Sequence, residues 1–148
     1  NNPVLDENKK DFRDPKVWLH QDKFYLVAGS KRKDDIGQVV FYVSEDGVTW
    51  EYLNKLTLGN AYGTVWECPD MFELDGKIIL MISPQELPKQ GENFENIHSV
   101  IALMGKFNYS NGEFDVEKIQ ELDSGFDFYA PQSILDKDGN RVMIAIIL

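Results

Sequence analysis

Residues 63–81 read GTVWECPDMFELDGKIILM, and within them Glu67 lies between a tryptophan and the only cysteine of the chain, two residues before Pro69. Two runs of strand-forming apolar residues come next, one before and one after an Asp-Gly pair. An Asp-Gly pair between two such runs is typical of a tight β-hairpin turn. Glutamate is among the residues least often buried without a partner. The stretch therefore predicts a hairpin whose first strand opens with a carboxylate that has a partner or a chemical role.

Two other segments repeat this arrangement. RDPKVWLHQDKFYLVAGS starts at Arg13, and YAPQSILDKDGNRVMIAII starts at Tyr129. Each runs from a proline through apolar residues and an acidic turn into a second strand, and the prolines, Pro15, Pro69 and Pro131, are 54 and 62 residues apart. A period of roughly 40 to 50 residues or slightly more, built from short strands, is typical of propeller blades.

The remaining strand signals agree with this interpretation. QVVFYVS and SVIALMGKF are rich in β-formers, and long helical periodicity is absent. SEDGVTW, residues 44–50, predicts a hairpin between outer strands with Trp50 packed beneath it. We therefore predict an all-β chain that forms part of a β-propeller, with about three blades of antiparallel strands over residues 10–60, 61–125 and 126–148, the last one incomplete.

Three blades cannot close a ring, because propellers need about four to eight. The sequence also stops inside the apolar run RVMIAIIL. We therefore expect residues 1–148 to be a fragment of one catalytic or binding domain.

Composition excludes several classes of partner. The 148 residues are 43% hydrophobic, as in a globular domain, and 25 acidic against 15 basic residues give a net charge of -10. Such a charge repels nucleic acids and anionic membranes. One cysteine and two histidines exclude a disulfide framework and a Cys/His zinc site. Apolar runs are too short to cross a bilayer and no secretory signal is visible, so we expect a cytoplasmic protein; secretion stays open because the chain does not begin with methionine.

Three acidic residues precede the repeated prolines. Asp14 stands directly before its proline, Glu67 two residues before, and Asp127 four residues before. If the repeats are blades, these side chains converge at one end of the central channel. Converging carboxylates are the arrangement that hydrolyses glycosides. Repulsion between like charges, with desolvation by Trp66, would raise the pKa of Glu67 and suit it to act as a general acid.

Each of these residues also has a purely structural interpretation. An aspartate before proline commonly forms a turn, and a glutamate at the start of a strand can simply pair with a lysine. Asp127 can cap a turn, Arg13 can be a surface ion-pair partner, and Cys68 can be a small buried hydrophobic residue. The residues alone leave these alternatives open.

Three motifs together, FRDPKVW (12–18), WECPD (66–70) and DFYAPQS (127–133), make the chain resemble glycoside hydrolase family 32, the β-fructofuranosidases such as invertase, sucrose-6-phosphate hydrolase, levanase and inulinase. The resemblance implies a five-bladed propeller followed by a β-sandwich. It also implies roles for individual residues: Glu67 as acid/base, Asp14 as a catalytic carboxylate that holds the fructosyl hydroxyls and stabilises the transition state, and Arg13, Trp66, Cys68, Asp127 and Tyr129 in the substrate site.

The resemblance implies retaining cleavage of sucrose, sucrose 6-phosphate or fructans, with a small carbohydrate as partner and with no metal or organic cofactor. It fails at two points. The nucleophile motif of the family, of the NDPNG type, does not occur here, so we expect this fragment to be inactive alone, and Ile146 stands where relatives commonly carry tryptophan. A non-catalytic carbohydrate-binding propeller and a five-bladed arabinanase or xylosidase type of glycosidase are the alternatives. The sequence does not predict an oligomeric state.

Overall fold

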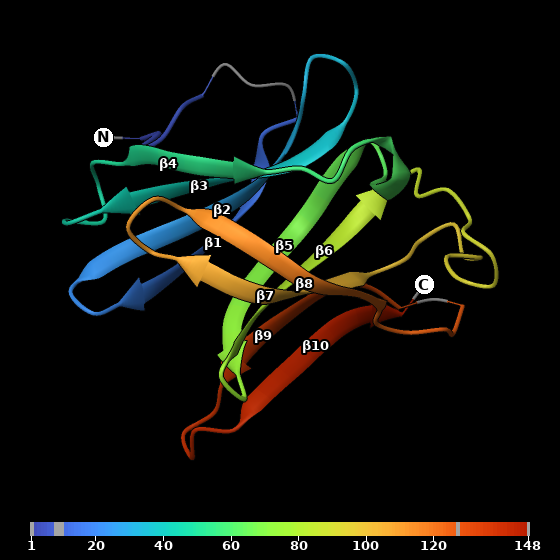
Figure 1. Cartoon of the computed structure of the whole chain (residues 1–148). Coiled ribbons are helices and arrows are strands. Elements are labelled where there is room, and N and C mark those ends of the chain that lie inside the picture. The colour runs from blue at the N-terminus through green and yellow to red at the C-terminus, as the bar shows by residue number, and fades with distance from the viewer. Residues whose placement is uncertain (1, 8–10, 127, 148) are drawn as a thin grey trace.

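The strands of the computed structural model, which describes residues 2–7, 11–126 and 128–147, form antiparallel sheets that fan around a common axis (Figure 1). The first sheet contains β1 (Arg13–His20), β2 (Lys23–Lys31), β3 (Gly37–Ser44) and β4 (Glu51–Leu56). After a 3₁₀ turn, Asn60–Tyr62, the second contains β5 (Val65–Leu74), β6 (Lys77–Gln85), β7 (Ile101–Asn108) and β8 (Glu113–Glu121). The third contains β9 (Phe128–Leu135) and β10 (Arg141–Ile147).

The strands of each sheet are paired in chain order, and the first strand of each sheet lies nearest the axis. β1 contacts β5, and β5 contacts β9. Each sheet falls inside one of the three residue ranges that the repeat predicts. The prediction of an all-β, open and partial propeller is confirmed. No helix in the described part of the chain has the length and apolar character needed to cross a membrane.

The predicted turns join the strands as hairpins. Asp75 and Gly76, with φ of 49° and 73°, connect β5 to β6, because Gly and Asp tolerate the positive φ that such turns require. Between β3 and β4, the Asp46 carboxylate accepts hydrogen bonds from the amides of Val48 and Thr49 at 2.8 and 2.7 Å. Trp50 packs beside this turn against the apolar cluster of β2 and β3, as predicted.

A β-bulge recurs on the first strand of every sheet, at the repeated proline. In β1, the two residues between Arg13 and Lys16 lie opposite the single residue between Gly29 and Val27. The same register shift lies between Glu67 and Asp70 in β5. β9 carries it opposite Ile144 and Ile146. The residue before each proline has positive φ: 53° at Asp14, 46° at Cys68 and 49° at Ala130.

This bulge changes which side chains face the axis. Successive side chains of a strand point to opposite faces, so residues three apart normally point away from each other. One extra residue restores the same face. Each axial strand therefore directs two side chains, three positions apart, toward the centre of the propeller.

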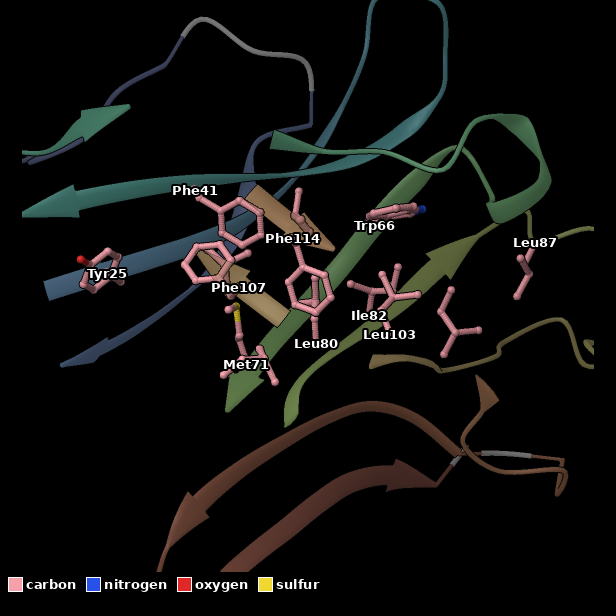
Figure 2. Close-up of a cluster of buried hydrophobic side chains, with 14 of the residues drawn as sticks. Tyr25, Phe41, Trp66, Met71, Leu80, Ile82, Leu87, Leu103, Phe107 and Phe114 are labelled. Atoms are coloured by element: carbon pink, nitrogen blue, oxygen red, sulfur yellow. The ribbon is translucent and has the colours of Figure 1, made fainter. Parts of the chain in front are cut away.

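The main core fills the space between the first and second sheets (Figure 2). Phe41 from the first sheet meets Phe107 from the second, with ring centroids 5.0 Å apart, and Phe107 in turn lies beside Phe114, with centroids 6.3 Å apart. The opposite face of β2 and β3 is also buried, under Leu5, Phe12 and Trp50. Burial on both faces explains why β2 reads as a continuous apolar run instead of an alternating one.

Candidate active site

The three residues that open the bulges, Arg13, Glu67 and Tyr129, meet at the axis although they are far apart in sequence. Arg13 Nη1 donates to Glu67 Oε1 at 2.9 Å, and the Tyr129 hydroxyl donates to Glu67 Oε2 at 2.7 Å. Arg13 and Tyr129 come from the two neighbouring sheets, so they hold the Glu67 carboxylate from both sides. We call these three residues the upper layer.

Asp14 belongs to the β1 bulge, directly after Arg13, and lies beside the upper layer. Its Oδ2 accepts the backbone N–H of Cys68 at 3.1 Å and contacts Cys68 Sγ at 3.6 Å. Asp14 and Cys68 both have positive φ, a conformation that costs energy for non-glycine residues and is common at functional sites. Asp14 is exposed and Glu67 retains 16% exposure of its side chain. The Asp14 carboxylate therefore lies against the backbone amide that directly follows Glu67, which brings the two predicted carboxylates into the same part of the axis.

The pKa of Glu67 is lowered, which is opposite to the prediction from the sequence. Burial raises it, but hydrogen bonds from Tyr129, Gln85 and Arg13, together with the Arg13 charge, outweigh burial and favour the carboxylate. Burial and nearby like charges alone would raise this pKa, and these donors reverse its direction. In the structure as it stands, Glu67 is an ionised acceptor.

Neighbouring groups are shifted in the other direction. Burial, with the charge and hydrogen bond of Asp14, raises the pKa of the Cys68 thiol to about 11. Burial and the hydrogen bond to Glu67 raise the pKa of Tyr129. At neutral pH the Cys68 thiol and the Tyr129 hydroxyl are therefore uncharged and can donate hydrogen bonds, while the Glu67 carboxylate accepts them. A site with both donors and acceptors can bind a molecule rich in hydroxyl groups.

Known proteins share the sequence and the fold of this chain. Residues 1–147 match the model of the glycosyl hydrolases family 32 N-terminal domain. The chain belongs to glycosyl hydrolase family 32. It is 37% identical over 139 residues to the sucrose-6-phosphate hydrolase of Bacillus subtilis, an alignment that covers 90% of this chain and 29% of that protein.

Solved family 32 structures have the same fold. A mutant of the Bombyx mori β-fructofuranosidase, in complex with sucrose, is 42% identical with a TM-score of 0.86, covering 97% of this chain and 32% of that one. The sucrose-6-phosphate hydrolase of Lactobacillus gasseri is 30% identical with a TM-score of 0.84, covering 95% and 30%. The present chain thus spans about a third of the length of the family 32 proteins it matches.

One residue that the family 32 motifs suggested, Trp66, does not line the described site. Trp66 has no exposed surface, lies in the core and donates its indole N–H to the Tyr62 carbonyl at 2.6 Å, so it cannot touch a sugar here. Adjacent side chains on a strand point to opposite faces, and since Glu67 faces the axis, Trp66 faces the core. Asp127 lies outside the described residues.

The equivalence of the repeats also needs correction. Asp14, Glu67 and Asp127 were aligned by their nearness to proline, but the bulges align Arg13 with Glu67 and Tyr129, and Asp14 with Cys68 and Ala130. Asp14 and Glu67 converge because neighbouring positions of adjacent strands meet at the axis.

Sequence reasoning missed several residues around this family 32 site. Gln85, at the end of β6, hydrogen bonds to Glu67, and the His98 ring, from the loop between β6 and β7, lies 4.9 Å from the Tyr129 ring. Neither Gln85 nor His98 is part of a sequence motif, so no local signal marks them. Among residues 2–7, 11–126 and 128–147, no group of three or more His, Cys, Asp or Glu side chains could hold a metal ion.

Proposed function

We propose that the full-length protein containing this chain hydrolyses β-fructofuranosides, meaning sucrose, sucrose 6-phosphate or fructans, with retention of configuration. The observation that carries the proposal is the Glu67 carboxylate, which Arg13 and Tyr129 hold at the axial mouth beside Asp14. Membership of family 32 and the names of its relatives support fructosides over arabinan or xylan.

Glu67 takes the role of acid/base. In the first half of the reaction it gives a proton to the glycosidic oxygen, and in the second half its carboxylate removes a proton from water. Arg13 and Tyr129 fix the direction of the two oxygens, and their hydrogen bonds favour the form needed in the second half. Only the small protonated fraction of Glu67 can start the reaction, so kcat/KM falls as the pH rises through the pKa of Glu67.

Asp14 takes the role of a sugar-binding carboxylate. Its exposed side chain is fixed at one oxygen by the Cys68 amide, an arrangement that suits hydrogen bonds to fructosyl hydroxyls and stabilisation of a cationic transition state. A retaining reaction also needs a nucleophilic carboxylate. The family's nucleophile motif does not occur in the 148 residues, so the assay uses the full-length gene product.

The test measures fructose release from sucrose, sucrose 6-phosphate and inulin by the full-length protein and by its Glu67→Gln variant. We expect Glu67→Gln to lower kcat by about 10²- to 10⁴-fold, the usual contribution of general acid–base catalysis. Glu73→Gln is the matched control because Glu73 lies exposed on the same strand, near its far end. If Glu67→Gln works as well as the control, the assignment of the acid/base is wrong.

A second candidate, a propeller that binds carbohydrate without cleaving it, is favoured by one observation. The lowered pKa of Glu67 keeps it an acceptor for sugar hydroxyls and not a proton donor. Calorimetric titration with fructose and sucrose distinguishes the two. Binding without fructose release by the full-length protein would support this second function.

A further inference from the structure

Directly below the upper layer lies a second set of three side chains, one from each axial strand and each following a repeated proline. Lys16 Nζ lies 3.1 Å from Asp70 Oδ1 and donates to Gln132 Oε1 at 3.3 Å. Lys16 also donates to the Ser133 carbonyl at 2.8 Å. We call Lys16, Asp70 and Gln132 the lower layer.

Asp70 is the buried centre of the lower layer. Asp70 has no exposed surface. Each of its two carboxylate oxygens contacts a different neighbouring strand: Oδ1 faces Lys16 of β1, and Oδ2 accepts the Ser133 N–H of β9 at 2.6 Å. A buried carboxylate is expensive unless it is paired, and buried ion pairs are weak evidence for stability. Their best-attested use is to specify one arrangement of the elements they join.

The lower layer reaches the site through the strained bulge. Gln132 Nε2 donates to the Cys68 carbonyl at 3.0 Å, while the N–H of Cys68 is bound by Asp14. Cys68, with φ of 46°, is therefore held on both sides of its backbone. A strained residue persists only where its surroundings over-determine it. Glu67 directly precedes Cys68, so the conformation of this bulge sets the direction of the Glu67 side chain.

We propose that the lower layer is a set of positioning residues, which fixes the three axial strands so that Arg13 and Tyr129 reach Glu67 in one geometry. The inference rests on the proposed function for its catalytic readout. Lys16, Asp70 and Gln132 touch no sugar and transfer no proton. They act through the upper layer.

The first test compares Asp70→Asn with the parent in the full-length protein. The variant keeps the shape of the side chain but loses its charge, which loosens β1 and β9 relative to β5. Displacements of about 1 Å can cost about 10²-fold in rate. We expect kcat to fall by about 10- to 100-fold while KM for sucrose changes by less than about threefold. Glu45→Gln is the control, since it removes an exposed ion pair with Lys23 far from the axis.

The second test needs no catalysis. Carbon-13 NMR of labelled glutamate follows the titration of Glu67, assigned by its absence in Glu67→Gln. The groups that face Glu67 are Arg13, Asp14, Cys68 and Tyr129, with His98 beside Tyr129. If loosened strands lengthen the bonds from Arg13 and Tyr129, Glu67 in Asp70→Asn titrates at a higher pH than in the parent. A lower stability alone would not move this titration in the folded protein.

Gln132→Met is the second variant, to be used where Asp70→Asn does not fold. It leaves both charges of the Lys16–Asp70 pair in place and removes the hydrogen bonds of Gln132 with Lys16 and with the Cys68 carbonyl, so we expect a shift of the Glu67 titration in the same direction. An unchanged titration of Glu67 together with an unchanged kcat in the folded variants overturns the positioning role. If the parent protein releases no fructose, the proposed function fails, while the NMR titration still decides the inference.

Discussion

Gly29 is the residue that allows the first two sheets to approach closely enough for Arg13 to reach Glu67. Gly29 pairs with Arg13 in the register of β1 and β2. A Cβ placed on it would lie 2.0 Å from the carbonyl oxygen of Trp66, the residue directly before Glu67. Gly29→Ala must therefore push β2 and β5 apart at the point where the two halves of the site meet.

The size of the effect follows from this distance. Close carbon–oxygen contacts in proteins are about 3.3 Å or longer, so the two strands must separate by about 1 Å. The obstructing atom belongs to the backbone and cannot rotate away. Overpacking of this kind costs about 1–3 kcal/mol. Alanine regains about 0.5–1 kcal/mol because it is less flexible than glycine in the unfolded chain, which leaves a net loss of roughly 0–2.5 kcal/mol, centred near 1 kcal/mol.

Urea unfolding followed by tryptophan fluorescence measures this loss. With a slope of about 2 kcal/mol per molar urea, the middle of the usual range, a net loss near 1 kcal/mol lowers the midpoint of Gly29→Ala by about 0.5 M. Gly125→Ala is the control, because a Cβ there meets only the end of the Asp123 side chain, and we expect a change within about 0.5 kcal/mol. Equal midpoints for the two variants would refute the proposed close approach of the sheets.

Three further predictions concern single side chains. Tyr129→Phe removes a donor that lowers the pKa of Glu67, so the fall of kcat/KM with rising pH should move to higher pH in the pH–rate profile of the full-length protein; a move to lower pH would contradict the role of this bond. Asp46 has its pKa lowered to about 2 by backbone hydrogen bonds from Thr49 and Val48, so its stabilising effect is present above its unfolded pKa of 3.8 and is lost as the pH falls toward 2. Thermal unfolding of Asp46→Asn should accordingly depend less on pH between about 4 and 2 than that of the parent, and identical slopes would count against this. Leu103→Ala, at a position without exposed surface, should cost about 2–5 kcal/mol in urea unfolding; a cost below about 1 kcal/mol would mean that the core collapses around the gap.

The strands and hairpins could be predicted because their signals are local. Apolar runs bounded by Asp-Gly and similar turns place β5 and β6, and the repeated proline marks the first strand of each sheet. The repeat also places Asp14 and Glu67 at the starts of neighbouring axial strands, although it pairs the wrong positions of these two strands. These inferences needed only periodicity and turn chemistry, which act over a few residues.

The β-bulges could not be predicted, since an extra residue in a strand leaves no distinct pattern when its neighbours are polar or proline. The effect of a bulge is large, because one extra residue moves every following side chain of the strand to the opposite face of the sheet. The sequence aligned Asp14 with Glu67, whereas the bulges align Arg13 with Glu67. A signal was present in retrospect: Lys16, Asp70 and Gln132 are polar residues at the same distance after Arg13, Glu67 and Tyr129, respectively, in strands that are otherwise largely apolar.

The pKa of Glu67 was predicted in the wrong direction for a related reason. Burial and nearby carboxylates can be guessed from the sequence, but the hydrogen bonds that outweigh them come from Arg13, 54 residues away, and Tyr129, 62 residues away. The sign of a pKa shift depends on which contributions are largest. That balance is set by three-dimensional contacts and not by neighbours in the sequence.

The upper and lower layers have the same arrangement of charges, but their carboxylates differ in exposure to solvent. This difference in exposure gives the two layers different roles. Each takes a cation from β1, an anion from β5 and a neutral hydrogen-bonding side chain from β9: Arg13, Glu67 and Tyr129 above, and Lys16, Asp70 and Gln132 below. Below, the carboxylate has no exposed surface and its charge serves to join strands. Above, the carboxylate side chain is 16% exposed and can exchange its partners for a sugar. A single repeated bulge thus supplies both the carboxylate that we propose to be reactive and the buried pair that would hold it in place.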